Sequence, residues 1–282
     1  MKVVIQQVDM DTALTALICG VSAEDEIVVV RGGASPEDLA DPSVLCIEAG
    51  GSGQVHLNNF DHHDTAEPLP PACRQALEAS GKTDPALSRL VDYVAAIDER
   101  GPSGLGPHPG FPTLSDVFSG MRLSIKNPIE QLHAGLAILT TVLRENLDPF
   151  GRMPERPQWQ EWIEARRRED EGLARARAEA EVFLAKSGKT VGFLQTEFIG
   201  ALEVLYSLGC QIAIAYSPRF GNPPIPKYTI AGKGVRVDHL LPFLNQLEPG
   251  WGGPAHGTII GSPRTGSRLT PGMVKQLVKE QA

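Results

Sequence analysis

Short apolar runs alternate with helix-forming stretches over the first hundred residues, and this alternation constrains the fold more than any other feature. We predict helices over 12–19 and 85–99, and strands over 2–8, 26–30, 44–47 and 54–60. The runs are too short for buried helices and stop at acidic or glycine-containing turns. Because consecutive parallel strands need crossover connections, the pattern predicts an α/β fold with a mostly parallel sheet.

The chain is long enough for two domains. It has 282 residues, of which 41% are hydrophobic. A predicted helix over 128–145 is followed by a proline-containing break at 149–157, so we place the end of the first domain at residue 150. Good helix formers fill 155–187, so we assign 151–187 to a connecting helix. Strand and helix patterns then restart, which predicts a smaller α/β domain over 188–282 with strands at 190–195, 211–216 and 227–230 and a helix at 200–208.

Charge is divided unevenly along the chain. The formal net charge is -8, yet residues 188–282 hold nine Lys or Arg against five Asp or Glu, which gives +4 there and -12 in the rest. An acidic part that holds cations and a basic part that holds an anion would suit this division. The run 166–168 contains three arginines, but three acids follow it directly. We interpret it as a solvated helix face, with a nucleic-acid contact as the alternative.

The sequence carries no sign of a membrane segment or a secreted scaffold. No apolar run approaches the roughly 20 residues of a bilayer span, and residues 1–5 lead directly into a strand without a cleavable leader. The four cysteines are scattered without paired spacing, so we expect core thiols and neither disulfides nor a zinc ribbon. We therefore expect a cytoplasmic protein without a membrane partner. A homodimer is compatible with the sequence.

Acidic and imidazole side chains follow several of the predicted strands. The first strand leads to Asp9 and Asp11, the third to Glu48, and the fourth to Asp61-His62-His63. Ligands in open α/β sheets bind beyond the carboxyl ends of the strands, so these side chains would meet at one edge. Taken singly, each could instead cap a helix or close a turn. Together they predict a mixed oxygen and nitrogen site, which suits manganese or magnesium.

Asp98 lies at the end of the predicted helix over 85–99, which Gly101-Pro102 terminates. The helix dipole disfavours an anion at this end unless a cation compensates it. Asp61 could orient a ligating histidine, because the second nitrogen of such an imidazole usually has an acidic partner.

The motifs in this order resemble the DHH phosphoesterases with the DHH-associated C-terminal domain. The resemblance covers nearly the whole chain and rests on the following motifs: Val8-Asp9-Met10-Asp11, Glu48-Ala49-Gly50-Gly51, Phe60-Asp61-His62-His63, Ile97-Asp98, Gly252-Gly253 and His256-Gly257. It implies a metal-binding phosphoesterase domain, a connecting helix and a substrate-binding domain. The resemblance also implies Mn²⁺ or Mg²⁺ as cofactor, with two ions bound.

Within that resemblance, each motif residue has an implied role. Glu48 bridges the ions, Asp9 serves one ion, and Asp11, His62 and Asp98 serve the other. Asp61 belongs to the catalytic set, and His63 faces the phosphate. The implied substrate-binding residues, besides His63, are Arg219, Lys233, Arg236, Gly252, Gly253, His256 and Arg264. Glycines let backbone N–H groups approach an anion, and arginine matches the geometry of phosphate.

Three departures from the family pattern bear on function. Ile5 stands where many members have a histidine ligand, although the single-strand exonucleases also lack it. Glu48 replaces the usual aspartate, which moves the carboxylate by one methylene. The usual Gly-Gly-His signature is interrupted, because Pro254 and Ala255 separate the glycines from His256. An ordinary tight turn is the alternative interpretation of Gly252-Gly253.

The resemblance therefore predicts an enzyme that hydrolyses a phosphodiester or phosphoanhydride in a nucleotide or short single-stranded oligonucleotide. A metal-activated water would be the nucleophile. Two alternatives stay open: a polyphosphate or pyrophosphate hydrolase of the same fold, and a non-catalytic nucleotide- or nucleic-acid-binding relative with a degenerate metal site. The departures at Ile5 and Glu48 motivate the second alternative.

Overall fold

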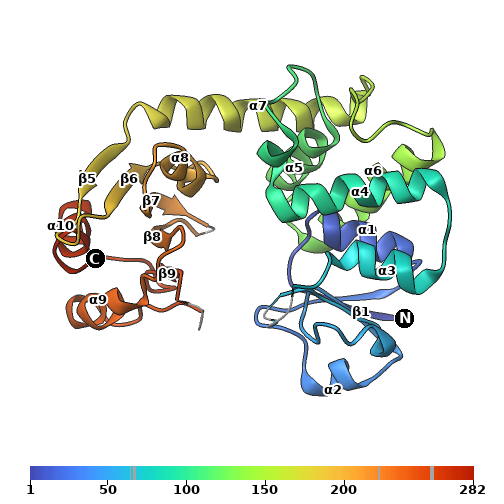
Figure 1. Ribbon diagram of the computed structural model, residues 1–282, viewed down its shortest axis with the longest axis horizontal. Coiled ribbons are helices and arrows are strands. Elements are labelled where there is room, and N and C mark those ends of the chain that lie inside the picture. Colours follow the sequence, from blue (N-terminus) through green and yellow to red (C-terminus); the bar gives the residue numbers. More distant parts are fainter. Residues whose placement is uncertain (64, 66–67, 222, 255–256) are drawn as a thin grey trace. The chain divides into compact units, whose positions relative to one another are not determined.

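The computed structural model of the chain (Figure 1) describes residues 1–63, 65, 68–221, 223–254 and 257–282, in two compact units, Met1–Arg166 and Arg167–Ala282. The elements of the N-terminal unit are β1 (Lys2–Ile5), α1 (Met10–Ile18), β2 (Glu26–Val29), α2 (Pro36–Ala40), β3 (Val44–Ile47), η1 (Val55–Leu57), β4 (Asn59–Phe60), α3 (Ala72–Ser80), α4 (Pro85–Arg100), η2 (Pro102–Leu105), α5 (Leu114–Ser124), α6 (Pro128–Arg144) and the start of α7 (Pro157–Arg177). The C-terminal unit contains β5 (Glu181–Leu184), β6 (Thr190–Gln195), α8 (Ala201–Ser207), β7 (Ile212–Phe220), β8 (Ile225–Gly232), η3 (Asp238–Leu240), α9 (Leu241–Leu247), β9 (Ile259–Gly261) and α10 (Pro271–Gln281).

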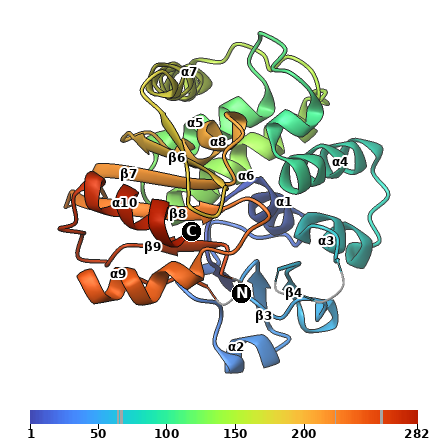
Figure 2. The ribbon, with the colours of Figure 1, turned by 60° about the vertical axis from the view of Figure 1, so that its left-hand side comes forward.

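The sheet of the N-terminal unit is entirely parallel, with strand order β2-β1-β3-β4. Alternate side chains of β1 enter different clusters, because successive strand residues point to opposite faces. Val3 and Ile5 pack into the large core formed with α1, α3, α4, α5 and α6, whereas Val4 packs with Leu39 of α2. Figure 2 shows β3 and β4 between α2 and the layer of α1 and α3. The predicted parallel α/β fold is confirmed.

Parallel pairing places the carboxyl ends of β1, β3 and β4 at one edge of this sheet. Ile5 is in register with Ile47, and Ile47 with Phe60. The residues that follow these three strands therefore leave the sheet side by side. This edge receives the acidic and histidine motifs.

The predicted strand over 54–60 is mostly wrong. Residues Val55–Leu57 form η1, and only Asn59–Phe60 pair with β3. Asn58 adopts a left-handed backbone conformation with φ +59° and ends η1. Asparagine tolerates this conformation better than most residues, so the chain turns here instead of extending.

The C-terminal unit is the predicted smaller α/β unit, built on a five-stranded mixed sheet with order β5-β6-β7-β8-β9. Side chains of α8 pack with Leu194 and Ala213 on one face of the sheet. Side chains of α9 and α10 join the cluster on the other face, which contains Phe193 and Ile214.

The predicted connecting helix is wrong in its last part. Helix α7 ends at Arg177, and Glu181–Leu184 forms β5, which pairs antiparallel with β6. Val182 and Phe183 favour strands, and the pairing with β6 outweighs the helix-forming composition of the surrounding stretch. Helix propensity alone could not reveal this partner.

All four cysteines are free; Cys46, Cys73 and Cys210 are buried and Cys19 is partly buried. In the described part of the chain, no helix combines the length and apolar character that crossing a bilayer requires.

A close contact between α5 and α7 gives a prediction of stability. A methyl group on Gly120 would lie 1.8 Å from the carbonyl oxygen of Trp162. Alanine normally favours a helix over glycine by about 1 kcal/mol, but overpacking costs about 1–3 kcal/mol. We expect Gly120→Ala to lower the free energy of unfolding measured by urea denaturation. Gly272→Ala in α10 is the control, because its nearest atom lies at 3.9 Å; that variant should be slightly stabilised, and a stabilised Gly120→Ala would contradict the packing.

Candidate metal centre

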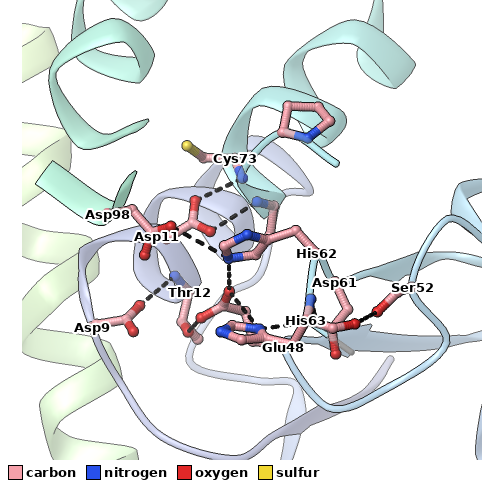
Figure 3. A network of polar contacts seen from close by, with 12 residues as sticks. Asp9, Asp11, Thr12, Glu48, Ser52, Asp61, His62, His63, Cys73 and Asp98 are labelled. Carbon is pink, nitrogen blue, oxygen red and sulfur yellow. Dashed lines mark hydrogen bonds and ion pairs between the residues drawn. The ribbon is translucent and has the colours of Figure 1, made fainter. Parts of the chain in front are cut away.

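His62 lies at the centre of the candidate site. Its Nε2 atom is 3.0 Å from Oε1 of Glu48 and 3.3 Å from Oδ2 of Asp98. Figure 3 shows the ring between Asp11 and Asp98 on one side and Glu48 on the other. His62 belongs to two groups of possible metal ligands. One group is Asp11, His62 and Asp98, and the other is Glu48, His62 and His63; within each group the ligand atoms lie within 4.8 Å of one another.

The contact between His62 and Glu48 is incomplete. Although the atoms are 3.0 Å apart, Nε2 of His62 and Oε1 of Glu48 are buried without a hydrogen-bond partner among the described residues. Buried polar atoms without partners cost free energy, so this pair needs a cation or a shared proton between them. The Glu48 carboxylate, and after it Asp98, raises the pKa of His62, while burial opposes the shift.

Glu48 reaches the site from an unusual backbone conformation. It follows β3 with φ +49°, in the left-handed region that bulky residues rarely adopt. Gly50 and Gly51 continue the turn with φ +106° and +75°. A methyl group on Gly51 would lie 2.8 Å from Nδ2 of Asn59, so the turn packs directly against β4. The Thr12 hydroxyl donates to Oε2 of Glu48 over 3.3 Å and fixes the carboxylate.

Asp11 is held by the start of α3. The backbone N–H groups of Ala72 and Cys73 donate to its two carboxylate oxygens, each over 2.8 Å. A helix N-terminus carries unpaired N–H groups and a partial positive charge, so it fits a carboxylate well. Burial and then the charge of Glu48 nevertheless raise the pKa of Asp11 to about 7. Burial and Glu48 also raise the pKa of Asp98.

Asp61 supports the loop around the histidines. One of its oxygens accepts from the backbone N–H of Gly50 over 2.6 Å, and the other accepts from the backbone N–H of His63 over 2.7 Å. Nδ1 of His63 lies 3.1 Å from the same oxygen. Burial alone would raise the pKa of Asp61, but the hydrogen bonds from His63 and Gly50 outweigh it and lower the pKa. The Asp61 contact raises the pKa of His63 to about 9, and the ring is exposed at the site.

Asp9 lies apart from both ligand groups. Its side chain caps α1 by accepting from the backbone N–H of Thr12 over 2.9 Å. Burial and Glu48 raise its pKa to about 6, while the positive charge of Arg122 opposes the shift. Ile5 is fully buried in the core, and Gln6 and Gln7 are exposed. Ile5 therefore offers no ligand atom at this edge of the sheet.

The donor set fits a hard divalent cation. The N-terminal sheet edge and α4 present five carboxylates (Asp9, Asp11, Glu48, Asp61 and Asp98) and two imidazoles. Carboxylates at this density repel one another strongly unless protons or cations compensate them. Carboxylate oxygens suit hard cations, and the two ligand groups contain no cysteine of the kind that softer metals prefer.

The predicted residues of the C-terminal unit are only partly brought together. Arg219 is exposed, and its Nε atom lies 4.0 Å from Oε1 of Glu197. Nζ of Lys233 lies 5.8 Å from the centre of the Tyr206 ring. Arg236 pairs with Asp238, and Gly257 packs against both side chains.

The glycine turn of this unit lies beside β9. Gly252 forms a β-bridge with Gly261, and a methyl group on Gly253 would lie 2.2 Å from the carbonyl oxygen of Ile259. Arg264 is exposed near Lys227, whose pKa is lowered by burial and by the charge of Arg264. His256 lies outside the described residues.

Several contributors were not predicted from sequence. Thr12 has no distinguishing signal beyond its position after Asp11. Helix α3 was missed, although Pro71 before it and Gly81 after it are typical helix boundaries. Gln75 was also missed; its amide donates to the backbone oxygens of Asp61 and Pro70.

The raised pKa values predict that the metal-free protein loses stability as pH rises from about 5 to 8. The pKa values of Asp9 and Asp11 rise from 3.8 to about 6 and 7, and that of His63 from 6.5 to about 9. The folded protein therefore binds more protons than the unfolded chain in this range, and that stabilisation is lost as pH rises through the folded values. The pKa of Asp61 is lowered, so this residue changes the stability only at pH values below its ordinary pKa of 3.8.

The measurement is the urea midpoint in EDTA at both pH values. Asp11→Asn should reduce the difference, and added Mn²⁺ should restore stability at the higher pH, because a cation replaces the lost protons. A midpoint in EDTA that rises with pH would contradict the assigned shifts.

No protein-family model matches the chain, and no curated protein matches it. Two solved structures are similar over most of their length. One is the pGpG-specific phosphodiesterase PggH from Vibrio cholerae, 17% identical with a TM-score of 0.58, covering 98% of this chain and 97% of that chain. The other is the DHH domain of a member of a family of ribosomal proteins, 12% identical with a TM-score of 0.55, covering 99% of this chain and 85% of that chain. These likenesses show that the chain has the DHH-type fold that the sequence resemblance predicted.

Proposed function

We propose that the protein is a metal-dependent phosphodiesterase that acts on a nucleotide or short oligonucleotide. The observation that carries the proposal is the convergence of Asp11, Glu48, His62 and Asp98 around two buried, unpartnered ligand atoms. The fold is shared with a phosphodiesterase specific for pGpG, which supports a phosphodiester as the bond cleaved.

The ligand groups suggest how a metal would be held. Asp11, His62 and Asp98 would bind one Mn²⁺ or Mg²⁺ ion. Glu48 would contribute to a second, with Asp9 as the family resemblance implies. Such ions lower the pKa of a bound water and neutralise charge that develops on phosphoryl oxygens. Thr12 and the N–H groups of α3 keep the carboxylates in position while substrate binds.

His63 is suited to the phosphate itself. Its pKa of about 9 keeps the ring protonated near neutral pH, and Asp61 engages Nδ1. The remaining ring nitrogen, Nε2, then carries a proton that it can donate to a phosphoryl oxygen. In the C-terminal unit, Arg219, Arg236 and the glycine turn at 252–253 would grip the rest of the substrate through charge-assisted hydrogen bonds and backbone N–H groups.

A non-catalytic nucleotide-binding protein is the second candidate. The observation that favours it is the placement of Asp9, which caps α1 outside both ligand groups, together with the burial of Ile5. A centre that retains a single ion could still bind a nucleotide phosphate. A polyphosphate or pyrophosphate substrate would use the same residues as a phosphodiester.

Hydrolysis by the metal-stripped and Mn²⁺-reloaded protein tests the proposal. Substrates are short oligonucleotides, cyclic dinucleotides, adenosine 3',5'-bisphosphate (pAp), bis(p-nitrophenyl) phosphate and pyrophosphate. We expect Mn²⁺-dependent release of a phosphate-bearing product. His62→Ala and Asp11→Asn should reduce kcat/KM by about a hundredfold or more, because metal stabilisation of charge is worth several kcal/mol.

His108→Ala is the matched control, because His108 pairs with Asp116 over 3.0 Å outside both ligand groups. That variant should retain wild-type kcat/KM. Absence of hydrolysis, or hydrolysis unaffected by His62→Ala, would overturn the proposal. Elemental analysis of bound manganese separates the candidates further: close to two ions per chain supports catalysis, whereas one or none together with nucleotide binding supports the second candidate.

A further inference from the structure

A pocket of about 260 Å³ opens beside the candidate metal centre within the N-terminal unit. Asp9, Asp11 and Asp98 line one side of it. Helix α5 lines another side with polar side chains: Ser115, Ser119 and Arg122. The pocket therefore places acids that suit a cation opposite donors that suit an anion.

The three α5 residues form one row. Their spacing of four and three residues places them on the same face of a helix. Thr113 and Asp116 form a reciprocal capping box that fixes the start of α5. The opposite side of the helix is fixed too, since Gly120 contacts the backbone of Trp162. The row is thus presented by an anchored helix.

Arg122 is the charged member of the row, and its guanidinium has no hydrogen-bond or ion-pair partner among the described residues. Arg74 and Arg89, by contrast, each pair with an aspartate at 2.8 Å. Arg122 and Asp9 of the candidate metal centre line the same pocket. An unpaired arginine on a pocket wall beside a metal centre is available to a ligand.

Electrostatics decide which ligand fits. Without a cation the three aspartates would repel an anion from this pocket. Once two divalent ions neutralise them, Arg122 leaves an excess of positive charge beside two serine hydroxyls that can donate hydrogen bonds. Guanidinium and hydroxyl donors together suit phosphate oxygens.

We infer that Ser115, Ser119 and Arg122 bind a second, uncleaved phosphate group of the substrate, next to the phosphodiester held at the metal centre. The inference rests on the proposed function and narrows it to nucleotides that carry a terminal phosphate besides the scissile one. Arg122 is then a specificity-determining residue on the N-terminal unit.

Kinetics with three dinucleotides test the inference. The Mn²⁺-loaded protein is assayed with ApA, pApA and ApAp, which lack or carry a terminal phosphate at either end. We expect the wild type to prefer one of the phosphorylated dinucleotides over ApA by about tenfold or more. Arg122→Gln should lower kcat/KM for that substrate by about 10- to 100-fold, mainly through KM, because a charge-assisted phosphate contact is lost. Arg122→Lys should restore part of the loss.

Lys126→Gln is the matched control. It removes the same charge four residues further on, from a side chain that donates to the carbonyl of Leu123 and does not line the pocket. This variant should keep the wild-type preference. If Arg122→Gln lowers kcat equally for ApA and the phosphorylated dinucleotides, Arg122 acts on the scissile phosphate and the inference is overturned.

A binding measurement separates failure of the inference from failure of the proposed function. Calorimetric titration with pAp and with AMP, in which Ca²⁺ replaces Mn²⁺ so that pAp is bound without being hydrolysed, measures binding alone. We expect about tenfold tighter binding of pAp, and loss of that difference in Arg122→Gln. If no dinucleotide is cleaved but this difference appears, the subsite stands and catalysis does not. Equal affinities in the wild type, or a difference that survives Arg122→Gln, would overturn the subsite.

Discussion

Repulsion among buried carboxylates is the constraint on which the N-terminal unit depends. Asp11, Glu48 and Asp61 are 1%, 5% and 3% exposed, and each would destabilise the fold without compensation. The N–H groups at the start of α3 compensate Asp11, and the loops around Gly50 and His63 compensate Asp61. Glu48, by contrast, keeps Oε1 without a hydrogen-bond partner among the described residues, and the facing Nε2 of His62 also has none. The protein scaffold thus compensates Asp11 and Asp61 itself, and leaves Glu48 incomplete at a position that a cation would occupy.

This compensation also ties distant parts of the chain together. Asp11 contacts Ala72 and Cys73, which follow it in the sequence by 61 and 62 positions. This contact fixes where α3 begins. Gln75, one turn into α3, in turn holds the backbone of Asp61. The strand ends, α3 and the histidine loop therefore form a single polar network. A substitution of one carboxylate would therefore also displace the elements that carry the others.

Local sequence signals predicted the strands and the helix that carry the candidate ligands, but not the contacts that hold those ligands in place. The strand ending at Ile47 and the helix bearing Asp98 follow from composition and periodicity, so their acids could be placed at one sheet edge. The strand over 54–60 failed because a single left-handed residue, Asn58, redirects the chain. The role of Arg122 depends on how α5 packs beside the first strand's turn, and no local pattern encodes that packing. The composition therefore could not predict contacts between segments that are remote in sequence.

The backbone at Glu48 shows what determines the residue at this position. Aspartate and asparagine are the non-glycine residues best suited to a left-handed conformation, and a longer side chain gains nothing there from the backbone. Glutamate therefore occupies a position whose local geometry favours the shorter acid. The extra methylene carries the carboxylate to Thr12 on one side and His62 on the other. The reach of the longer side chain, and not the preference of the backbone, therefore accounts for glutamate at position 48.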